Sequence, residues 1–170
     1  MSIILHNLSE EDDLVKQYGE YNSPDQIYGL DAHLTFDGVY KNVYENRMCL
    51  ADKDVTLFVM GDYVGADNST IDPDRPLEYF CDWNEIMEMV TMYNCKLGWH
   101  TWSHPDLTEV NDERLRKEVT PPFPMETFAY PYSRFDDRVI EAVKAAGYKE
   151  AYSVERTDGT QYTKVRTYLH

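Results

Sequence analysis

The chain has 170 residues, of which 42% are apolar, and this fits one globular domain with a buried core. It carries 31 Asp and Glu against 16 Lys and Arg, and the resulting net charge of -15 repels nucleic acid and anionic lipid. We therefore expect one domain over residues 1–170 that binds neither nucleic acid nor a membrane.

The N-terminus has no basic start, and only a few apolar residues precede its acidic run, so it does not resemble a secretory signal. No apolar stretch approaches the roughly 20 residues of a membrane span. We expect a cytoplasmic protein. Residues 1–28 are an N-terminal segment that no periodic pattern places, and His6, which lies within it, is assigned no role.

From residue 33 onward, strand-like and helix-like segments alternate, which indicates an α/β domain with a mostly parallel sheet. Residues 33–37 form the first expected strand, which ends in the carboxylate of Asp37. A helical period follows over residues 40–51, and residues 55–60 give a nearly continuous apolar strand. Residues 61–80 contain Gly and Pro but few periodic apolar positions, and they predict a long loop.

The second half continues this alternation. Asp82-Trp-Asn-Glu85 resembles a capping box, which predicts the start of a helix. Ser133-Arg-Phe-Asp136 predicts the cap of a second helix, which ends at Gly147. The other expected elements are strands at residues 96–100, 127–130, 151–154 and 164–169, and a polar helix at residues 111–118.

Two histidines, His100 and His104, follow a predicted strand directly. Imidazoles four residues apart face one point if the segment turns, and two such nitrogens are suitable ligands for Zn²⁺. Asp37 also stands at a strand end. Because side chains converge at the C-terminal edge of a parallel barrel, the three residues are candidates for one site, although a turn-forming carboxylate before Gly38 is an alternative for Asp37.

Three ordered segments are similar to motifs of the polysaccharide deacetylase family, the NodB homology domain. These segments are Leu34-Thr-Phe-Asp-Gly-Val-Tyr, His100-Thr-Trp-Ser-His-Pro-Asp-Leu and Phe128-Ala-Tyr-Pro-Tyr-Ser. Connecting pieces match too, and the similarity covers about residues 29 to 168. The resemblance implies a distorted, trimmed (β/α) barrel and a metal-dependent hydrolase that removes acetyl groups from an N-acetylated carbohydrate.

The resemblance also implies roles for individual residues. His100 and His104 would bind the divalent metal, for which the resemblance implies Zn²⁺, and Asp37 matches the general base. Tyr132 falls where the family offers a backbone N–H to the developing oxyanion, and Pro131 shapes the pocket beside it. No organic cofactor is implied.

The chain departs from the family pattern at several positions. The family's second Asp, a metal ligand, is Gly38 here, so either Asp37 becomes a ligand or the metal has only two protein ligands. Ala129 stands where many members have an Arg that orients the base. His170 is a candidate for the family's general acid, although a C-terminal residue is more often frayed.

Two features of the barrel and its surroundings stay open. The segment between Glu118 and Phe128 is shorter than its family counterpart, so we expect a barrel edge that is either open or covered by another copy in a homo-oligomer. His33 is expected to point into the barrel or toward a loop. Trp99 and Trp102 flank His100, and core packing is favoured over a sugar groove for at least one of them.

Three functions fit these observations. The first is hydrolysis of the amide of an N-acetylated sugar or glycan. The second is a non-catalytic glycan-binding or structural module, which Gly38 favours. The third is an enzyme acting on a small cyclic amide or a nucleotide-linked sugar, which suits a cytoplasmic location better than polymer cleavage does.

Overall fold

A computed structural model describes residues 2–5, 7–8, 21–22, 27–28, 30–71, 73–74, 76–154 and 159–168. Seven parallel strands form a closed barrel in the order β1-β4-β5-β6-β7-β8-β9. Their bounds are β1 Ser2–Leu5, β4 His33–Asp37, β5 Asp54–Val59, β6 Lys96–Trp99, β7 Thr127–Ala129, β8 Glu150–Val154 and β9 Lys164–Tyr168. The predicted (β/α) barrel is therefore confirmed, and the short strands β2 (Asn7–Leu8) and β3 (Tyr21–Asn22) form a separate pair.

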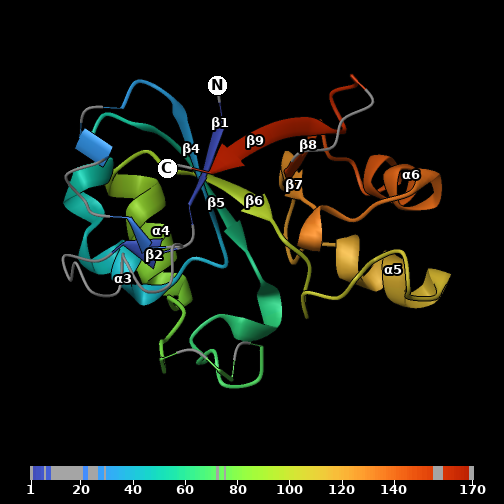
Figure 1. Ribbon diagram of the computed structural model, residues 1–170, viewed down its shortest axis with the longest axis horizontal. Helices are drawn as coiled ribbons and strands as arrows, with labels where there is room; N and C mark the ends of the chain where they lie inside the picture. The colour runs from blue at the N-terminus through green and yellow to red at the C-terminus, as the bar shows by residue number, and fades with distance from the viewer. Residues whose placement is uncertain are drawn as a thin grey trace.

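Helices cover the barrel on two sides (Figure 1). Helices α3 and α4 lie on one side, and α5 and α6 lie on the other. The helical bounds are α3 Lys41–Glu45, η1 Arg47–Leu50, η2 Gly61–Tyr63, α4 Trp83–Met92, α5 Asp112–Val119, η3 Pro131–Ser133 and α6 Asp137–Ala145. Within the described residues, none of these helices is long and apolar enough to cross a lipid bilayer.

The barrel closes where its first and last strands pair. Strand β1 pairs with β4 on one side and with β9 on the other. In the pairing with β9, Ile3 lies opposite Thr167 and Ile4 lies opposite Tyr168. The expectation that one edge of the barrel is open, or is covered by another copy of the chain, is therefore wrong. The sequence did not reveal β1 because only three consecutive apolar residues, Ile3, Ile4 and Leu5, mark it, and so short a run has no usable period.

Helix starts follow the capping chemistry of the sequence. The predicted capping box of α4 is confirmed, because Asp82 accepts the N–H of Glu85 and the Glu85 side chain accepts the N–H of Asp82. Helix α6 begins later than Ser133, with Asp136 as its cap. The Ser133 hydroxyl instead accepts the N–H of Val154 at 2.7 Å, which ties η3 to β8.

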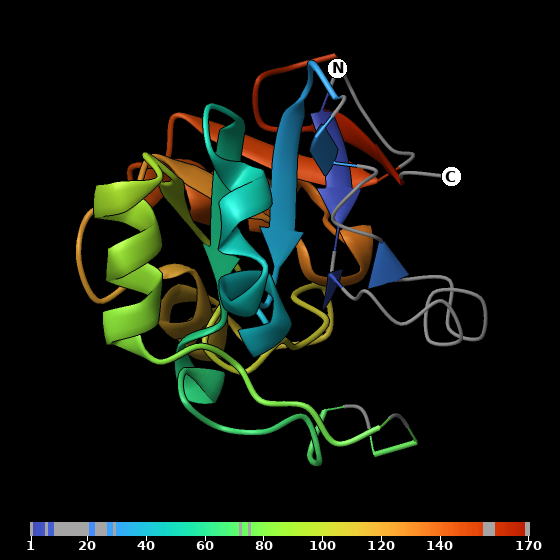
Figure 2. The ribbon, with the colours of Figure 1, turned by 90° about the vertical axis from the view of Figure 1, so that its left-hand side faces the viewer.

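The predicted long loop is held against the end of the barrel. Antiparallel bridges join Tyr40 to Phe80 and Asp67 to Tyr79, and the side chains of Tyr40, Met60 and Phe80 form a small cluster of their own. Figure 2 shows this segment extending beyond the ends of β4 and β5. The loop therefore stands beside the C-terminal edge of the barrel, where parallel barrels carry their sites.

Aromatic side chains fill the barrel interior, and small residues beside them leave the space that the rings occupy. Phe58, Ala129 and Tyr152 form a buried cluster, separate from the main core between the strands and helices. Gly98 makes room for it, because a Cβ there would lie 2.4 Å from the Phe58 ring. Thr127 Oγ1 would also lie only 2.6 Å away. Gly98 is thus required by close packing.

We expect Gly98→Ala to lower the free energy of unfolding by about 1–3 kcal/mol, because the added methyl overpacks the barrel interior. Urea unfolding measures this loss. In a Phe58→Leu background the same methyl should cost less, because the ring atoms that it meets are gone. Strictly additive losses in the double variant would show that the Phe58 contact is not their source.

Candidate active site

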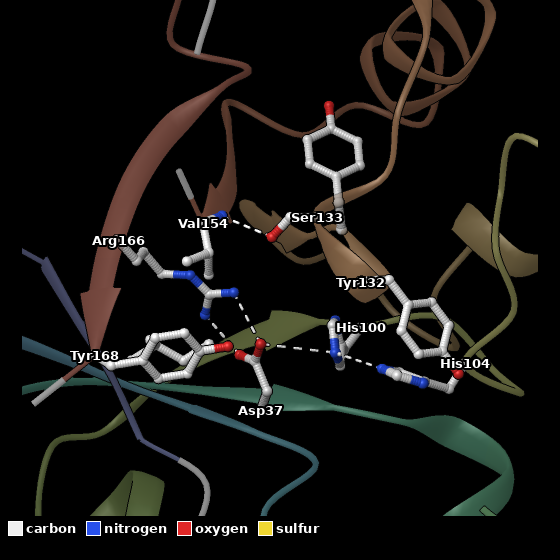
Figure 3. Close-up of a pocket in the computed structure, with 10 residues that line it drawn as sticks. Asp37, His100, His104, Tyr132, Ser133, Val154, Arg166 and Tyr168 are labelled. Carbon is white, nitrogen blue, oxygen red and sulfur yellow. Dashed lines mark hydrogen bonds and ion pairs between the residues drawn. The ribbon is translucent and has the colours of Figure 1, made fainter. Parts of the chain in front are cut away.

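A cavity of about 510 Å³ opens at the C-terminal ends of the barrel strands. Asp37, His100 and His104, three of the predicted site residues, lie together in it, and Figure 3 shows their polar groups facing one another. Tyr132 lines the same cavity. The remaining wall is formed by Ile4, Tyr130, Ser133, Val154, Arg166 and Tyr168.

His100 follows β6 directly, and its ring is held by the neighbouring strand. Only 3% of the residue is exposed, and its Nδ1 lies 2.8 Å from the carbonyl oxygen of Ala129. Because a carbonyl oxygen can only accept a hydrogen bond, Nδ1 is assigned the proton. The lone pair of the neutral ring is therefore on Nε2, which points into the cavity. Metal-binding histidines commonly have this arrangement.

His104 meets His100 through a tight turn. Its backbone has a left-handed φ of 55°, and its N–H donates to Thr101 Oγ1 at 3.0 Å. The turn places His104 Nε2 3.1 Å from His100 Nε2. The Tyr132 ring packs on the other side of His104, with ring centroids 4.7 Å apart. The two imidazoles thus converge on one point, as the four-residue spacing predicted.

Asp37 is paired with a residue that the sequence analysis did not identify. Arg166, from β9, donates from its two terminal nitrogens to the two oxygens of Asp37 at 2.6 and 2.8 Å (Figure 3). One of these nitrogens also donates to Thr35 Oγ1 at 3.1 Å, and the guanidinium lies 5.1 Å from the centroid of Phe58. Both members of the pair are buried, with 6% of Asp37 and 1% of Arg166 exposed. Such a bidentate pair fixes the orientation of the carboxylate.

Arg166 holds the Asp37 carboxylate from β9, whereas the resemblance placed an Arg at position 129. Ala129 has no side chain that reaches Asp37, but its carbonyl oxygen orients His100. The sequence did contain one indication of such a partner. Asp37 was expected inside the barrel, and a buried carboxylate needs a cation nearby. The strand carrying Arg166 shows no apolar alternation that would have marked its buried face, because only Arg166 is buried among its five residues.

Gly38 cannot be replaced simply by a second carboxylate. Its φ of 87° is in the left-handed region, and a Cβ there would lie 2.9 Å from the end of the Met60 side chain and 3.2 Å from Phe80. Its N–H donates to the carbonyl oxygen of Phe58. The left-handed backbone is therefore the main structural reason for glycine at this position, because the flexible end of Met60 can move aside.

The donor set of the cavity fits a divalent ion in part. No group of three or more His, Cys, Asp or Glu side chains suited to a metal was found in the described part of the chain. The two imidazole nitrogens do fit, because two ligands of a tetrahedral zinc ion are about 3.3 Å apart. Asp37 Oδ2 lies 3.7 Å from His100 Nε2, which is close enough for its carboxylate to act beside an ion bound there.

Pro131 and Tyr132 belong to the turn after β7. Pro131 is buried, whereas 60% of Tyr132 is exposed at the mouth of the cavity. Tyr132 and Ser133 both have a left-handed φ of 54°. The turn brings the ring of Tyr132 against His104, and a role for the backbone N–H of Tyr132 stays a prediction.

Other predicted residues lie elsewhere. His33 stands at the start of β4, where its ring nitrogens contact Ser2 and Thr56, and burial lowers its pKa. Trp99 is fully buried, and Trp102 packs against it with ring centroids 5.0 Å apart, so core packing is confirmed for Trp99. His6 and His170 lie outside the described residues.

Residues 30–151 match a family model described as Polysaccharide deacetylase. The chain is 28% identical over 114 residues to an uncharacterized 30.6 kDa protein of Geobacillus stearothermophilus, a match that covers 65% of this chain and 37% of that protein.

Solved structures share the fold at low sequence identity. A polysaccharide deacetylase from Bacillus cereus superposes with a TM-score of 0.70 at 18% identity, over 99% of this chain and 64% of that one. The Streptococcus pyogenes deacetylase PplD, in complex with acetate, gives a TM-score of 0.73 at 13% identity, over 99% and 91% of the two chains. The chain thus spans less than two thirds of the Geobacillus and Bacillus proteins.

We expect Arg166→Met to lower the free energy of unfolding by about 3–5 kcal/mol, because it leaves the buried Asp37 charge without a partner. Urea unfolding measures the loss. Adding Asp37→Asn should recover part of it, and Arg116→Met, on the exposed face of α5, should change stability by no more than about 0.5 kcal/mol. A double variant no more stable than Arg166→Met would contradict the role of the pair.

Proposed function

Because the chain belongs to the polysaccharide deacetylase family, we propose that it hydrolyses the amide of an N-acetylated sugar or glycan with the help of a divalent metal ion, most simply Zn²⁺. The observation that carries this proposal is the convergence of His100 Nε2 and His104 Nε2 at 3.1 Å beside the fixed carboxylate of Asp37. A divalent ion held by the two histidines would acidify a water molecule and polarise the acetyl carbonyl.

Asp37 acts as the general base in this scheme. Each of its oxygens accepts one N–H of Arg166, and the carboxylate lines the cavity with Oδ2 3.7 Å from His100 Nε2, beside the proposed ion. Because Arg166 holds the carboxylate in one orientation, Asp37 can take the proton while the hydroxide adds to the acetyl carbon. The C–N bond then breaks as the nitrogen takes up the proton that Asp37 received, and acetate and the free amine leave.

The cavity wall supplies the remaining functions. The backbone N–H of Tyr132 stabilises the negative charge that develops on the acetyl oxygen, and buried Pro131 fixes the turn that presents it. His170 as general acid stays a prediction. The rings of Tyr132 and Tyr168, which are 60% and 43% exposed, flank Asp37 and the histidines in Figure 3 and are suited to stacking on a sugar ring.

A non-catalytic glycan-binding module is the second candidate. Gly38 favours it, because the position offers no carboxylate and two imidazoles alone hold a metal loosely. In that case the aromatic walls of the cavity would bind the sugar, and Asp37 and Arg166 would serve only the stability of the barrel.

Metal content and acetate release separate the two candidates. We expect the wild-type protein to bind about one zinc ion per chain and to release acetate from N-acetylglucosamine oligomers, and we expect His100→Ala/His104→Ala to lose both properties. His33→Gln is the matched control, because His33 lies at the opposite end of β4 and should leave both unchanged. A wild-type protein that binds the oligomers without zinc or acetate release would favour the binding module.

The role of Asp37 has a separate test. Asp37→Asn keeps the shape of the side chain but removes the base, so we expect the rate of acetate release to fall about 10²–10⁴-fold while one zinc ion per chain is still bound. Single-turnover rates and metal analysis of the same sample measure the two effects. Loss of zinc in this variant would instead make Asp37 the third ligand.

A further inference from the structure

The side chain of Glu118 is buried at the end of α5, outside the cavity, and it holds the loop that carries His104. Its Oε2 accepts the backbone N–H groups of Trp102 at 2.9 Å and Ser103 at 3.0 Å. Its Oε1 accepts the Ser103 hydroxyl at 2.6 Å. Only 3% of Glu118 is exposed, and Arg114 Nε, 3.5 Å away, offsets part of its charge. A buried carboxylate thus gathers three donors from the two residues just before His104.

The same loop is held from its other side by the backbone of η2. The N–H of Gly61 donates to the carbonyl oxygen of Thr101, and that of Asp62 donates to the carbonyl oxygen of Trp102, both at 3.0 Å. The approach is so close that a Cβ on Gly61 would lie 2.3 Å from the Trp102 ring. The donors of the loop therefore bond to Glu118, and two of its acceptors bond to η2.

This double attachment matters because the loop backbone is strained. Thr101 has a φ of 71° and His104 a φ of 55°, both in the left-handed region that residues other than glycine seldom adopt. A β-branched residue such as Thr is especially unfavourable there. Such conformations persist only where several surrounding contacts enforce them. Without its contacts to Glu118, the segment from Thr101 to His104 would be free to relax.

The two histidines do not depend on this loop equally. His100 lies at the strand end and is oriented by the carbonyl oxygen of Ala129, which belongs to β7. His104 lies beyond the strained turn, and its place 3.1 Å from His100 is set by the loop. A relaxed loop would therefore move His104 and leave His100 in position.

We propose that Glu118 is a positioning residue for the histidine pair, which sets the site's affinity for a divalent metal without touching either imidazole. The proposal rests on the proposed metal-dependent function, because it takes His100 and His104 as the ligands. Partners that orient ligands from outside the coordination sphere typically change metal affinity 10–100-fold when they are removed. Glu118 belongs to this class of residue, although it acts on the backbone before the ligand and not on the ring.

Zinc titration against a chromophoric chelator tests the proposal on the full chain. We expect Glu118→Ala to weaken zinc binding about 10–100-fold. Glu118→Gln should weaken it less, because its amide oxygen still accepts from the backbone N–H groups, and Ser103→Ala should weaken it least. Glu113→Gln is the matched control, because Glu113 is exposed on the same helix and should leave the affinity unchanged.

A second measurement on the metal-free protein separates positioning from general stability. Well below the unfolding temperature, we expect faster amide hydrogen exchange at Trp102 and Ser103 in Glu118→Ala, with shifted ring NMR signals for His104 and smaller shifts for His100. A residue that only stabilises the fold would lower the melting temperature and leave these signals as in the wild type.

The outcomes are distinct. A wild-type protein that binds no zinc would contradict the proposed function, while the His104 signals of the metal-free variants would still decide the role of Glu118. A folded Glu118→Ala with wild-type His104 signals would overturn the proposal, and so would wild-type zinc affinity. If Glu118→Ala does not fold, Glu118→Gln and Ser103→Ala are judged by the same two measurements.

Discussion

The buried ion pair between Arg166 and Asp37 is the interaction on which the candidate site depends. It joins the last strand of the barrel, β9, to β4, the first strand after the N-terminal segment. A buried carboxylate without a cation would be costly, and a buried guanidinium would be equally so. The pair thus stabilises a charged group where a reaction can use it, and it keeps that group in one orientation.

Beside this pair, backbone groups and one buried carboxylate hold the two histidines in place. The carbonyl oxygen of Ala129 selects the tautomer of His100, and the backbone of η2 and the carboxylate of Glu118 hold the turn to His104. Small residues let these elements approach one another, because a Cβ at Gly61 or Gly98 would collide with aromatic rings. The catalytic geometry that we propose therefore depends on residues that carry no reactive group themselves.

Much of the fold followed from local patterns. The strand that ends in Asp37, the capping box at Asp82 and the alternation of strands and helices needed only a few neighbouring residues to be recognised. The convergence of Asp37, His100 and His104 was also predicted, because chain order and strand ends place them at one edge. Arg166 and Glu118 were not predicted, because their roles depend on contacts that are distant in sequence. Arg166 contacts Asp37, which lies 129 positions earlier in the chain. Glu118 contacts Trp102 and Ser103, which lie 16 and 15 positions earlier. Strand β1 was missed because it is too short for its period to be read.

Closure of the barrel by β1 and β9 has a consequence for how the protein folds. The two strands are separated by more than 150 residues, so their pairing is among the least local contacts in the chain, and such contacts form slowly and late. During synthesis from the N-terminus, Asp37 and both histidines leave the ribosome well before Arg166 does. The cavity can therefore be completed only after nearly the whole described chain has been made, and until then the edges of β1 and β8 remain unpaired and open to association with other chains.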